Sequence, residues 1–342
     1  MKRTDLVEAL KRVAPALSVK DLVPAFSDFF FDGERLQAFD GVVAIQTPLA
    51  APIKCGLPGK LLGEFLGASH ATDVEFTFSE GKAEVKAGRA RMSLPSLPLE
   101  DFPFKWPDAK SISIEASDAL LAAVKACETT MGVDPSQPAL LGITIEVEPD
   151  HLVLYSSTNL QMTSCVVKVK PPKVLVGRTF VLPVRFCELL LARARPDTIA
   201  IGADAVQAHY KDGTRLFSAT TGEASAKTFR TVMDGVDWKD GFVKVPKGLE
   251  GCLSRALVVM SGDETQHTDV TIKGDRMRFQ TVTRVAVATD YVVIEKHPDA
   301  EVSVRPSLLV GPLEHAAEIR VLKACVAFKG PNYKSMVSVV GA

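Results

Sequence analysis

The sequence predicts an α+β fold built from six copies of one β-α-β-β-β unit. A strand that runs into a helix recurs roughly every 60 residues. Four of these helix entries contain proline, which suits a first helical turn because its missing N–H would have no intrahelical partner there. The helices are expected to begin near residues 4, 58, 117, 183, 246 and 306, with prolines at Pro58, Pro183, Pro246 and Pro306.

Segments in which apolar and polar side chains alternate follow each expected helix. Residues 73–78 alternate, turn at Glu80-Gly81-Lys82, and return over 83–86. Alternation between Gly, Asp and Pro turns is typical of antiparallel strands with one solvated face. Comparable segments follow the next four helices, at 143–147 and 152–155, at 198–201, 206–210 and 215–217, at 270–272 and 277–280, and at 318–321 and 325–328.

The expected helices have apolar stripes that must cover a sheet face. The first helix places Leu6, Leu10 and Val13 on one side. A single unit would leave its sheet edges open and part of its apolar face uncovered, so units are expected to pair. Pairing predicts three similar domains, at residues 1–110, 111–238 and 239–342. The alternative is two or three unrelated α+β domains whose regular spacing is accidental.

Composition is that of a soluble globular protein. Of the 342 residues 46% are hydrophobic and 24% charged, and the net charge of −1 shows no global basicity. A site for a polyanion would therefore need charge sorted to one face. Six cysteines without a CxxC pair, and no signal-like segment in Met1–Val13, predict reduced thiols in the cytoplasm. No apolar run approaches the ~20 residues that span a bilayer.

No motif for catalysis, a metal or a cofactor stands out. The chain lacks GxxxxGK[ST], GxSxG and HExxH patterns, and its six histidines are far apart. Glu100-Asp101 has no visible partner base. Asp263-Glu264 followed by His267 is better read as a solvated loop than as a metal cluster. The sequence therefore predicts a protein that is not an enzyme and that needs no cofactor.

Four segments carry a resemblance to a known family. They are the LQAFDG run at Leu36–Gly41, the basic GRARMSLPSLP strand at Gly88–Pro98, the EDFP connector at Glu100–Pro103, and QPALLGI at Gln137–Ile143. Their order along the chain resembles that of the bacterial-type DNA sliding clamp, the β subunit of DNA polymerase III. The basic strand with its connector is the most specific of these matches.

The resemblance implies a ring made by two three-domain chains joined head to tail, with helices around the hole and sheets outside. Such a ring holds double-stranded DNA by topology, so its contacts are weak and independent of sequence. The implied partners are DNA, a DNA polymerase, a clamp loader and a second copy of the chain. The implied dimer interface comprises Arg89, Arg91, Met92 and Leu94 on one edge, and Leu257 and Met260 with the adjoining strands on the other.

Basic residues on the helices are the expected DNA contacts. Acidic residues share the same helices, so the positive bias is mild, and for any one position an ordinary solvated face is an equal alternative. The family places a DNA-contacting basic residue at the position of Lys20. The other candidates are Arg3, Lys11, Arg12, Lys60, Lys125, Arg185, Arg193, Arg195, Lys247 and Arg255.

The resemblance also implies an apolar pocket that receives short peptides from partner proteins. The family's arginines in this pocket are replaced here by Gln137 and Thr231, and its methionine-proline-methionine run by Ser338-Val339-Val340. These departures predict altered partner specificity, as a divergent or phage-encoded clamp would show. Val339 and Val340 have the alternative of simply ending a core strand. The pocket would comprise Gln137, Leu140, Ser157, Asn159, Met162, Thr231, Val232, Met336, Val339 and Val340.

Two other functions stay open at this point. The altered pocket and the mild excess of basic residues also fit a clamp-like scaffold that binds replication partners without encircling DNA. A hydrolase or transferase on a duplicated α+β scaffold would need a cleft with a strongly perturbed acid or base, which the sequence does not display.

Overall fold

The computed structural model describes residues 1–19, 23–106, 112–115, 117–132, 134, 136, 140–201, 205–219, 226–260 and 267–340. The chain forms two compact bodies. The first body comprises Met1–Ala116 and Glu188–Thr220, and the second comprises Ser117–Cys187 and Thr221–Ala342. Most of repeat 4, in the expected middle domain, belongs to the first body, and the division into three domains stays a prediction.

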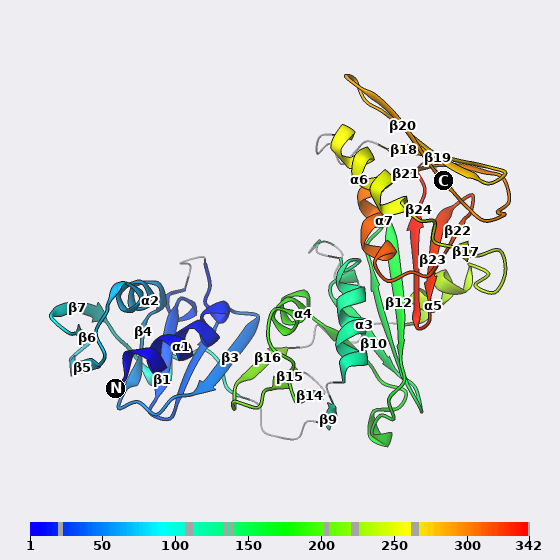
Figure 1. The fold of residues 1–342 in the computed structure, drawn as a ribbon. Coiled ribbons are helices and arrows are strands. Elements are labelled where there is room, and N and C mark those ends of the chain that lie inside the picture. Colours follow the sequence, from blue (N-terminus) through cyan, green and yellow to red (C-terminus); the bar gives the residue numbers. More distant parts are fainter. Residues whose placement is uncertain are drawn as a thin grey trace. The chain divides into compact units, whose positions relative to one another are not determined.

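The six β-α-β-β-β repeats are confirmed (Figure 1). Repeat 1 has α1 (Arg3–Val13), β1 (Asp28–Asp32), β2 (Arg35–Phe39) and β3 (Val43–Pro48), with an isolated bridge at Lys2 as its first strand. Repeat 2 has β4 (Lys54–Pro58), α2 (Gly59–Ala68), β5 (Val74–Ser79), β6 (Lys82–Ala87) and β7 (Ala90–Pro95). Repeat 3 has β9 (Ile112–Glu115), α3 (Asp118–Glu128), β10 (Ile143–Val147), β11 (Leu152–Ser157) and β12 (Gln161–Val167).

The later repeats have the same order of elements. Repeat 4 has β13 (Thr179–Leu182), α4 (Val184–Leu191), β14 (Thr198–Ile201), β15 (Ala205–His209) and β16 (Arg215–Ala219). Repeat 5 has β17 (Val243–Lys244), α6 (Leu249–Met260), β18 (Thr268–Lys273), β19 (Arg276–Val282) and β20 (Val287–Val293). Repeat 6 has β21 (Ala300–Val304), α7 (Pro306–Leu313), β22 (Glu318–Val321), β23 (Cys325–Gly330) and β24 (Tyr333–Ser338).

The role expected for proline needs a correction at three of the four helices. Only Pro306 is a first helical residue. Pro58 is the N-cap of α2, Pro183 immediately precedes α4, and Pro246 lies before α6. The backbone φ of −53° at Pro58 shows why proline fits there, because its ring holds φ near that of a helix while its ψ of 113° stays extended.

Each body holds two antiparallel sheets (Figure 1). The first body has a nine-stranded sheet in the order β8-β4-β1-β2-β3-β16-β15-β14-β9, in which β8 is Leu97–Pro98, and a three-stranded sheet β5-β6-β7. The second body has an eight-stranded sheet in the order β13-β10-β11-β12-β24-β23-β22-β17, and a four-stranded sheet β20-β19-β18-β21.

The repeats join through their last strands. β3 of repeat 1 pairs with β16 of repeat 4, and the Thr47 and Thr214 hydroxyls meet at 2.9 Å across that joint. β12 of repeat 3 pairs with β24 of repeat 6, where the Thr163 hydroxyl donates to Ser335 at 3.0 Å. The last strands of repeats 2 and 5, β7 and β20, lie at the ends of their sheets. Among the described strands, β7 and β20 are therefore the two last strands of a repeat that have no partner repeat in one copy of the chain.

The apolar stripes lie in the core as expected. Leu6, Leu10 and Val13 of α1 are buried, as are Leu249 and Leu253 of α6. All six cysteines are buried and free. Among the described residues, no helix is both long enough and apolar enough to cross a membrane.

The EDFP connector has a packing role. The ring centroid of Phe102 lies 5.0 Å from that of Phe30, and Phe104 lies 4.5 Å from Phe217. The Trp106 indole N–H donates to the Gln37 side chain at 2.9 Å. These aromatic rings pack against strands of both repeat 1 and repeat 4 in the nine-stranded sheet, and so stabilise the pairing of β3 with β16.

A buried carboxyl group makes stability depend on pH. Asp28 of β1 is 7% exposed, and burial raises its pKa from 3.8 to about 6. The unfolded chain therefore releases the Asp28 proton before the folded chain does, so stability falls as pH rises from about 4 to about 6, by about 3 kcal/mol. Asp28→Asn is expected to remove this loss and to be the more stable protein at pH 7.5. Urea unfolding of the wild-type and Asp28→Asn proteins at pH 4 and 7.5 measures this change in the free energy of unfolding. An equal change with pH in both proteins would contradict the prediction.

Candidate functional site

Four of the predicted DNA-contacting residues are exposed lysines. Lys11 lies on α1, Lys60 on α2, Lys125 on α3, and Lys247 just before α6. Within the part of the chain that the structure describes, none of the four has a side-chain hydrogen bond or ion pair within its own chain. Their ammonium groups are therefore available to phosphate groups.

Several of the predicted arginines instead hold helices in place. Arg3 donates to the carbonyls of Ala71 at 2.9 Å and Leu66 at 3.1 Å, and so caps the end of α2. Arg255 of α6 forms an ion pair with Asp290 of β20 at 2.5 Å. These two guanidinium groups have partners within their own body, so their charge is already partly compensated.

The remaining arginines differ in exposure. Arg12 pairs with Glu8 at 2.5 Å and with Asp212 at 3.5 Å. Arg193, half-buried, donates to the Arg12 carbonyl and lies 5.9 Å from the Tyr210 ring centroid, and burial lowers its pKa. Arg195 is exposed, 3.8 Å from Glu115, and Arg185 is half-buried on α4. Lys20 lies outside the described residues.

An open cleft of about 460 Å³ lies between α1 and the residues that follow α4. It is lined by Lys11, Arg12 and Arg193, but also by Glu8 and Asp212. Because both signs of charge line this cleft and its ion pairs are internal, it offers no strong preference for an anion.

Residues predicted for the partner pocket meet at an apolar cluster in the second body. Met162 is buried there, and Leu140 and Met336 pack against it half-exposed. The cluster sits between the sheet and α5 (Ala226–Asp234), a helix that the sequence pattern did not reveal. Its buried members are Val153, Tyr155, Met162, Ala226, Phe229 and Met233.

The other predicted pocket residues have varied positions. Thr231 and Val232 are exposed on α5, with Val232 at 40%. Ser157 is buried and donates to the carbonyls of Thr158 and Gln161, which closes a turn that leaves Asn159 exposed. Gln137 lies outside the described residues.

Val339 and Val340 continue the chain beyond β24. The Val339 N–H donates to Ala324 at 3.2 Å and the Val340 N–H to Ser303 at 2.7 Å. Val340 is 41% exposed. Their backbones are therefore held in place while one of their side chains stays on the surface.

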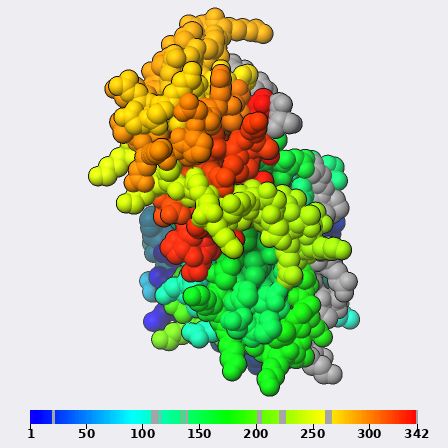
Figure 2. All heavy atoms as spheres, turned by 90° about the vertical axis from the view of Figure 1, so that its right-hand side faces the viewer, coloured from blue at the N-terminus to red at the C-terminus, as the bar shows by residue number. Residues whose placement is uncertain are grey.

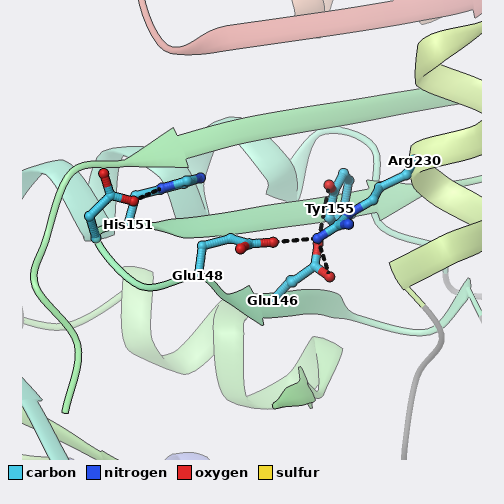
Figure 3. A network of polar contacts seen from close by, with 6 residues as sticks. Glu146, Glu148, His151, Tyr155 and Arg230 are labelled. Atoms are coloured by element: carbon cyan, nitrogen blue, oxygen red, sulfur yellow. Dashed lines mark hydrogen bonds and ion pairs between the residues drawn. The ribbon is translucent and has the colours of Figure 1, made fainter. Parts of the chain in front are cut away.

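Arg230 fixes α5 to the eight-stranded sheet (Figure 3). Its guanidinium contacts Glu146 at 2.6 Å and also pairs with Glu148, both at the end of β10. The Tyr155 ring stacks on Phe229 of α5 with centroids 5.5 Å apart. Burial raises the pKa of Tyr155 to about 12, so its hydroxyl stays protonated. The ion pairs of Arg230 and the ring contact of Phe229 together position α5.

Trp238 also packs against this cluster, and the sequence analysis did not predict it. It packs against the buried cluster, and its indole N–H donates to the Met233 carbonyl at 2.7 Å. The Lys334 ammonium lies 5.3 Å from its ring centroid. The sequence did contain a sign of this role, because the chain has only two tryptophans and Trp238 follows the apolar stripe of α5.

The predicted dimer-interface residues lie on or near β7 and β20, the unpaired last strands of repeats 2 and 5, and their role stays a prediction. Arg91 and Met92 are on β7, and Arg89 is exposed in the turn before it, but Leu94 is only 1% exposed. Residues 257–260 are helical, and β20, one of the strands that adjoin this helix, lies at the end of its sheet.

Leu257 and Met260 lie in α6, and Met260 is in the core. Leu257 is half-exposed on the same helix, and its role in a dimer interface stays a prediction. Beside them, an apolar groove of about 310 Å³ lies between α6 and the strands β19 and β20. Within the described residues, no group of three or more His, Cys, Asp or Glu side chains is arranged to hold a metal ion, and Asp263 and Glu264 lie outside those residues.

Residues 1–106 match the model of the N-terminal domain of the DNA polymerase III beta subunit. The beta sliding clamp of Streptomyces coelicolor is 26% identical over 165 residues, which is 46% of this chain and 44% of that protein. The beta sliding clamp of Haemophilus influenzae is 20% identical over 227 residues, 62% of each. The chain thus spans less than two thirds of the length of either curated relative.

Solved structures match over the full length. The Caulobacter crescentus beta sliding clamp has a TM-score of 0.85 at 17% identity, covering 100% of this chain and 98% of that one. The sliding clamp of Pseudomonas aeruginosa has a TM-score of 0.85 at 17% identity, covering 100% and 99%. Residues 1–106 are therefore similar to the N-terminal domain of the DNA polymerase III beta subunit, and the whole chain has the fold of the bacterial sliding clamps.

Proposed function

We propose that this chain is a DNA sliding clamp, a processivity factor that encircles duplex DNA and tethers a replicative polymerase. The observation that carries the proposal is the way the repeats join. Repeats 1 and 4 share one continuous sheet through their last strands, and repeats 3 and 6 share another. By the same rule β7 of repeat 2 should pair with β20 of repeat 5, but in one copy both are open.

A second copy of the chain satisfies both open edges. If β7 of each copy pairs with β20 of the other, the assembly is a head-to-tail homodimer with every repeat joined, and heterologous contacts of this kind close into a ring. Closure removes edges that otherwise invite aggregation. The same closure would bring the helices of twelve repeats into one assembly, because each copy has six.

The exposed lysines support a role in sliding. Lys11, Lys60, Lys125 and Lys247 lie on or next to four different helices, and a net charge of −1 avoids tight binding. Weak phosphate contacts spread over several helices favour diffusion along DNA over arrest at one site. We assign the partner pocket to the apolar cluster between β12, β24 and α5, with Leu140, Met336 and Val232 at its surface.

The proposed partners are a DNA polymerase and a clamp loader, both recruited through this pocket, and the proposed compartment is the cytoplasm. A clamp acts by topology, so the proposal includes no catalytic step. The scaffold alternative keeps one observation in its favour, because Arg3, Arg12, Arg193 and Arg255 are engaged within the chain.

Retention on DNA with blocked ends tests the proposal. The protein is incubated with linear duplex that is biotinylated at both ends, and streptavidin is added before the salt concentration is raised. A ring that has threaded onto the DNA stays on the blocked duplex and slides off the same duplex without streptavidin. Equal binding to both forms would indicate a conventional DNA binder, and no retention on either would favour the scaffold.

A further inference from the structure

Large apolar side chains are exposed on one face of the β19–β20 hairpin. Val282 of β19 is 52% exposed, and Val287, Tyr291 and Val293 of β20 are 66%, 58% and 65% exposed. The strand register places Val282 opposite Val287, so these two side chains are neighbours. The hairpin, orange in Figures 1 and 2, extends beyond the rest of the second body. Adjoining exposed apolar residues of this kind mark an interaction surface.

This surface is the side of the hairpin that is turned away from α6. On the side next to α6, the strands line the apolar groove with Phe279, Thr281, Ala288 and Asp290. Because successive side chains of a strand point to opposite faces of the sheet, the residues between these four point away from α6. We call this outward surface, with Val282, Val287, Tyr291 and Val293, the hairpin face.

The corresponding sheet face in repeat 2 is polar. On its strands Arg91 pairs with Glu84 at 3.2 Å and Lys86 pairs with Glu75 at 2.9 Å, as expected of a face that stays in water. The repeat does not require an apolar outer face, so the exposed apolar residues of the hairpin face need a separate explanation. Ring closure through strand edges does not supply one, because edge pairing uses backbone groups in the plane of the sheet and leaves this face uncovered.

Three exposed arginines accompany the apolar residues. Arg276 and Arg278 lie on β19, and Arg284 lies at the tip of the hairpin. Arg278 is opposite Tyr291 in the strand register, and the Arg276 guanidinium lies 5.3 Å from the Tyr291 ring centroid. In the described ranges of the chain, no acidic side chain forms an ion pair with any of the three arginines. The hairpin face therefore combines apolar area with uncompensated positive charge.

The acidic residues on the same side of the sheet lie farther from the apolar residues. Asp269 is on β18, where the Ser303 hydroxyl donates to it at 2.5 Å, and Glu301 is on β21. In the strand order β20-β19-β18-β21, the arginines of β19 separate these carboxylates from the apolar side chains of β20. A negative partner group that reached β19 and β20 would therefore meet the arginines first.

We propose that the hairpin face binds a different protein through a segment that carries carboxylate side chains among apolar ones. Guanidinium groups hold carboxylates through paired hydrogen bonds, and arginine and tyrosine contribute strongly to the affinity of protein interfaces. The three valines favour a protein over a nucleic acid, because bases stack on aromatic rings rather than on branched aliphatic side chains. The face is turned away from α6, so docking here leaves that helix free.

Two matched double variants of the full chain test the proposal. The hairpin variant combines Val282→Ser with Arg278→Glu, both on β19, and leaves the edge strand β20 unchanged. The loop variant makes the same two substitutions before β13, as Val174→Ser with Arg178→Glu, where Val174 is 57% exposed and Arg178 is also exposed. Circular dichroism and urea unfolding midpoints of both variants are expected to match wild type, because all four side chains are at the surface.

A phage-displayed library of random peptides is the probe. It is selected on the immobilised wild-type protein and depleted on the hairpin variant, which removes peptides that bind elsewhere. The retained peptides are expected to be rich in Asp and Glu beside apolar residues. By fluorescence anisotropy, their dissociation constants should rise on the order of tenfold or more in the hairpin variant and stay unchanged in the loop variant. Affinity should also fall between about 0.1 and about 1 M NaCl, because salt screens exposed charges.

Three results would overturn the proposal. The first is a library in which no peptide survives depletion, or in which the surviving peptides lack acidic residues. The second is a labelled oligothymidylate that binds wild type but not the hairpin variant, since the face would then recognise single-stranded nucleic acid. The third concerns Arg278→Ala, which keeps the valines and decides the matter if the hairpin variant unfolds more readily: unchanged affinity for the retained peptides would exclude the arginine from the site. None of these results depends on whether the chain forms a ring.

Discussion

Charge reversal at Lys60, Lys125 and Lys247 together is expected to lower the affinity for duplex DNA and its salt dependence, while rings that have threaded stay on DNA with blocked ends. The three lysines lie on or beside α2, α3 and α6, and all are exposed. In a homodimer the change removes six positive charges and adds six negative ones. Each lost phosphate contact lowers the slope of log affinity against log salt by about 0.9, so the slope should fall by up to about five. Fluorescence anisotropy with short duplex DNA between 50 and 200 mM salt measures this slope.

A matched variant controls for net charge. Lys82, Lys105 and Lys273 are also exposed, but they lie on strands or on the connector rather than on the helices. Reversing these three gives the same net charge and is expected to leave both the affinity and the salt slope close to wild type. If the two triple variants lose affinity equally, DNA is held by the general field of the protein, and the helices have no special role.

Gly142→Ala is expected to lower the free energy of unfolding by about 3 kcal/mol or more. Gly142 precedes β10 with φ of +84°, and a Cβ there would lie 2.1 Å from the Leu182 carbonyl oxygen. That oxygen belongs to β13, which pairs with β10, so it cannot move without breaking the sheet. β10 also carries Glu146, so α5 and the partner pocket should loosen together with the strand.

Gly63→Ala in α2 is the control for replacing glycine as such. Nothing lies within 4 Å of the added methyl group, and alanine is the better helix former, so stability is expected to rise by about 0.5–1 kcal/mol. Urea unfolding followed by circular dichroism compares the two variants with wild type. A stable Gly142→Ala protein would contradict the backbone geometry at the start of β10.

The repeat pattern was readable from the sequence because its signals are local. Helix N-termini depend on a few consecutive residues, as at Ser117, whose hydroxyl accepts from the Leu120 N–H at 3.2 Å. Strands depend on alternation over five or six residues, as in β5 and β6. The exposed lysines were found for the same reason, because a charged residue opposite a buried helical stripe faces solvent wherever the helix is placed.

Contacts between distant segments could not be predicted from the sequence. Arg230 and Glu146 are 84 residues apart, and no local pattern shows that they meet. The stripe of α5 is Ala226, Phe229 and Met233, short enough to pass for a connector. The partners of Arg3, Arg193 and Arg255 could not be predicted either, because a sequence shows a charge but not the carbonyl or carboxylate that it contacts.

The sequence by itself determined the six repeats, the faces of their helices and the exposed lysines, since these follow from backbone propensity and side-chain periodicity. Only the tertiary structure decided which last strands pair, which arginines have partners within the chain, and that β7 and β20 have no partner strand on one side. The physical reason is that strand pairing and ion pairing join residues far apart in the chain, and any edge strand offers the same backbone groups until the fold places another beside it.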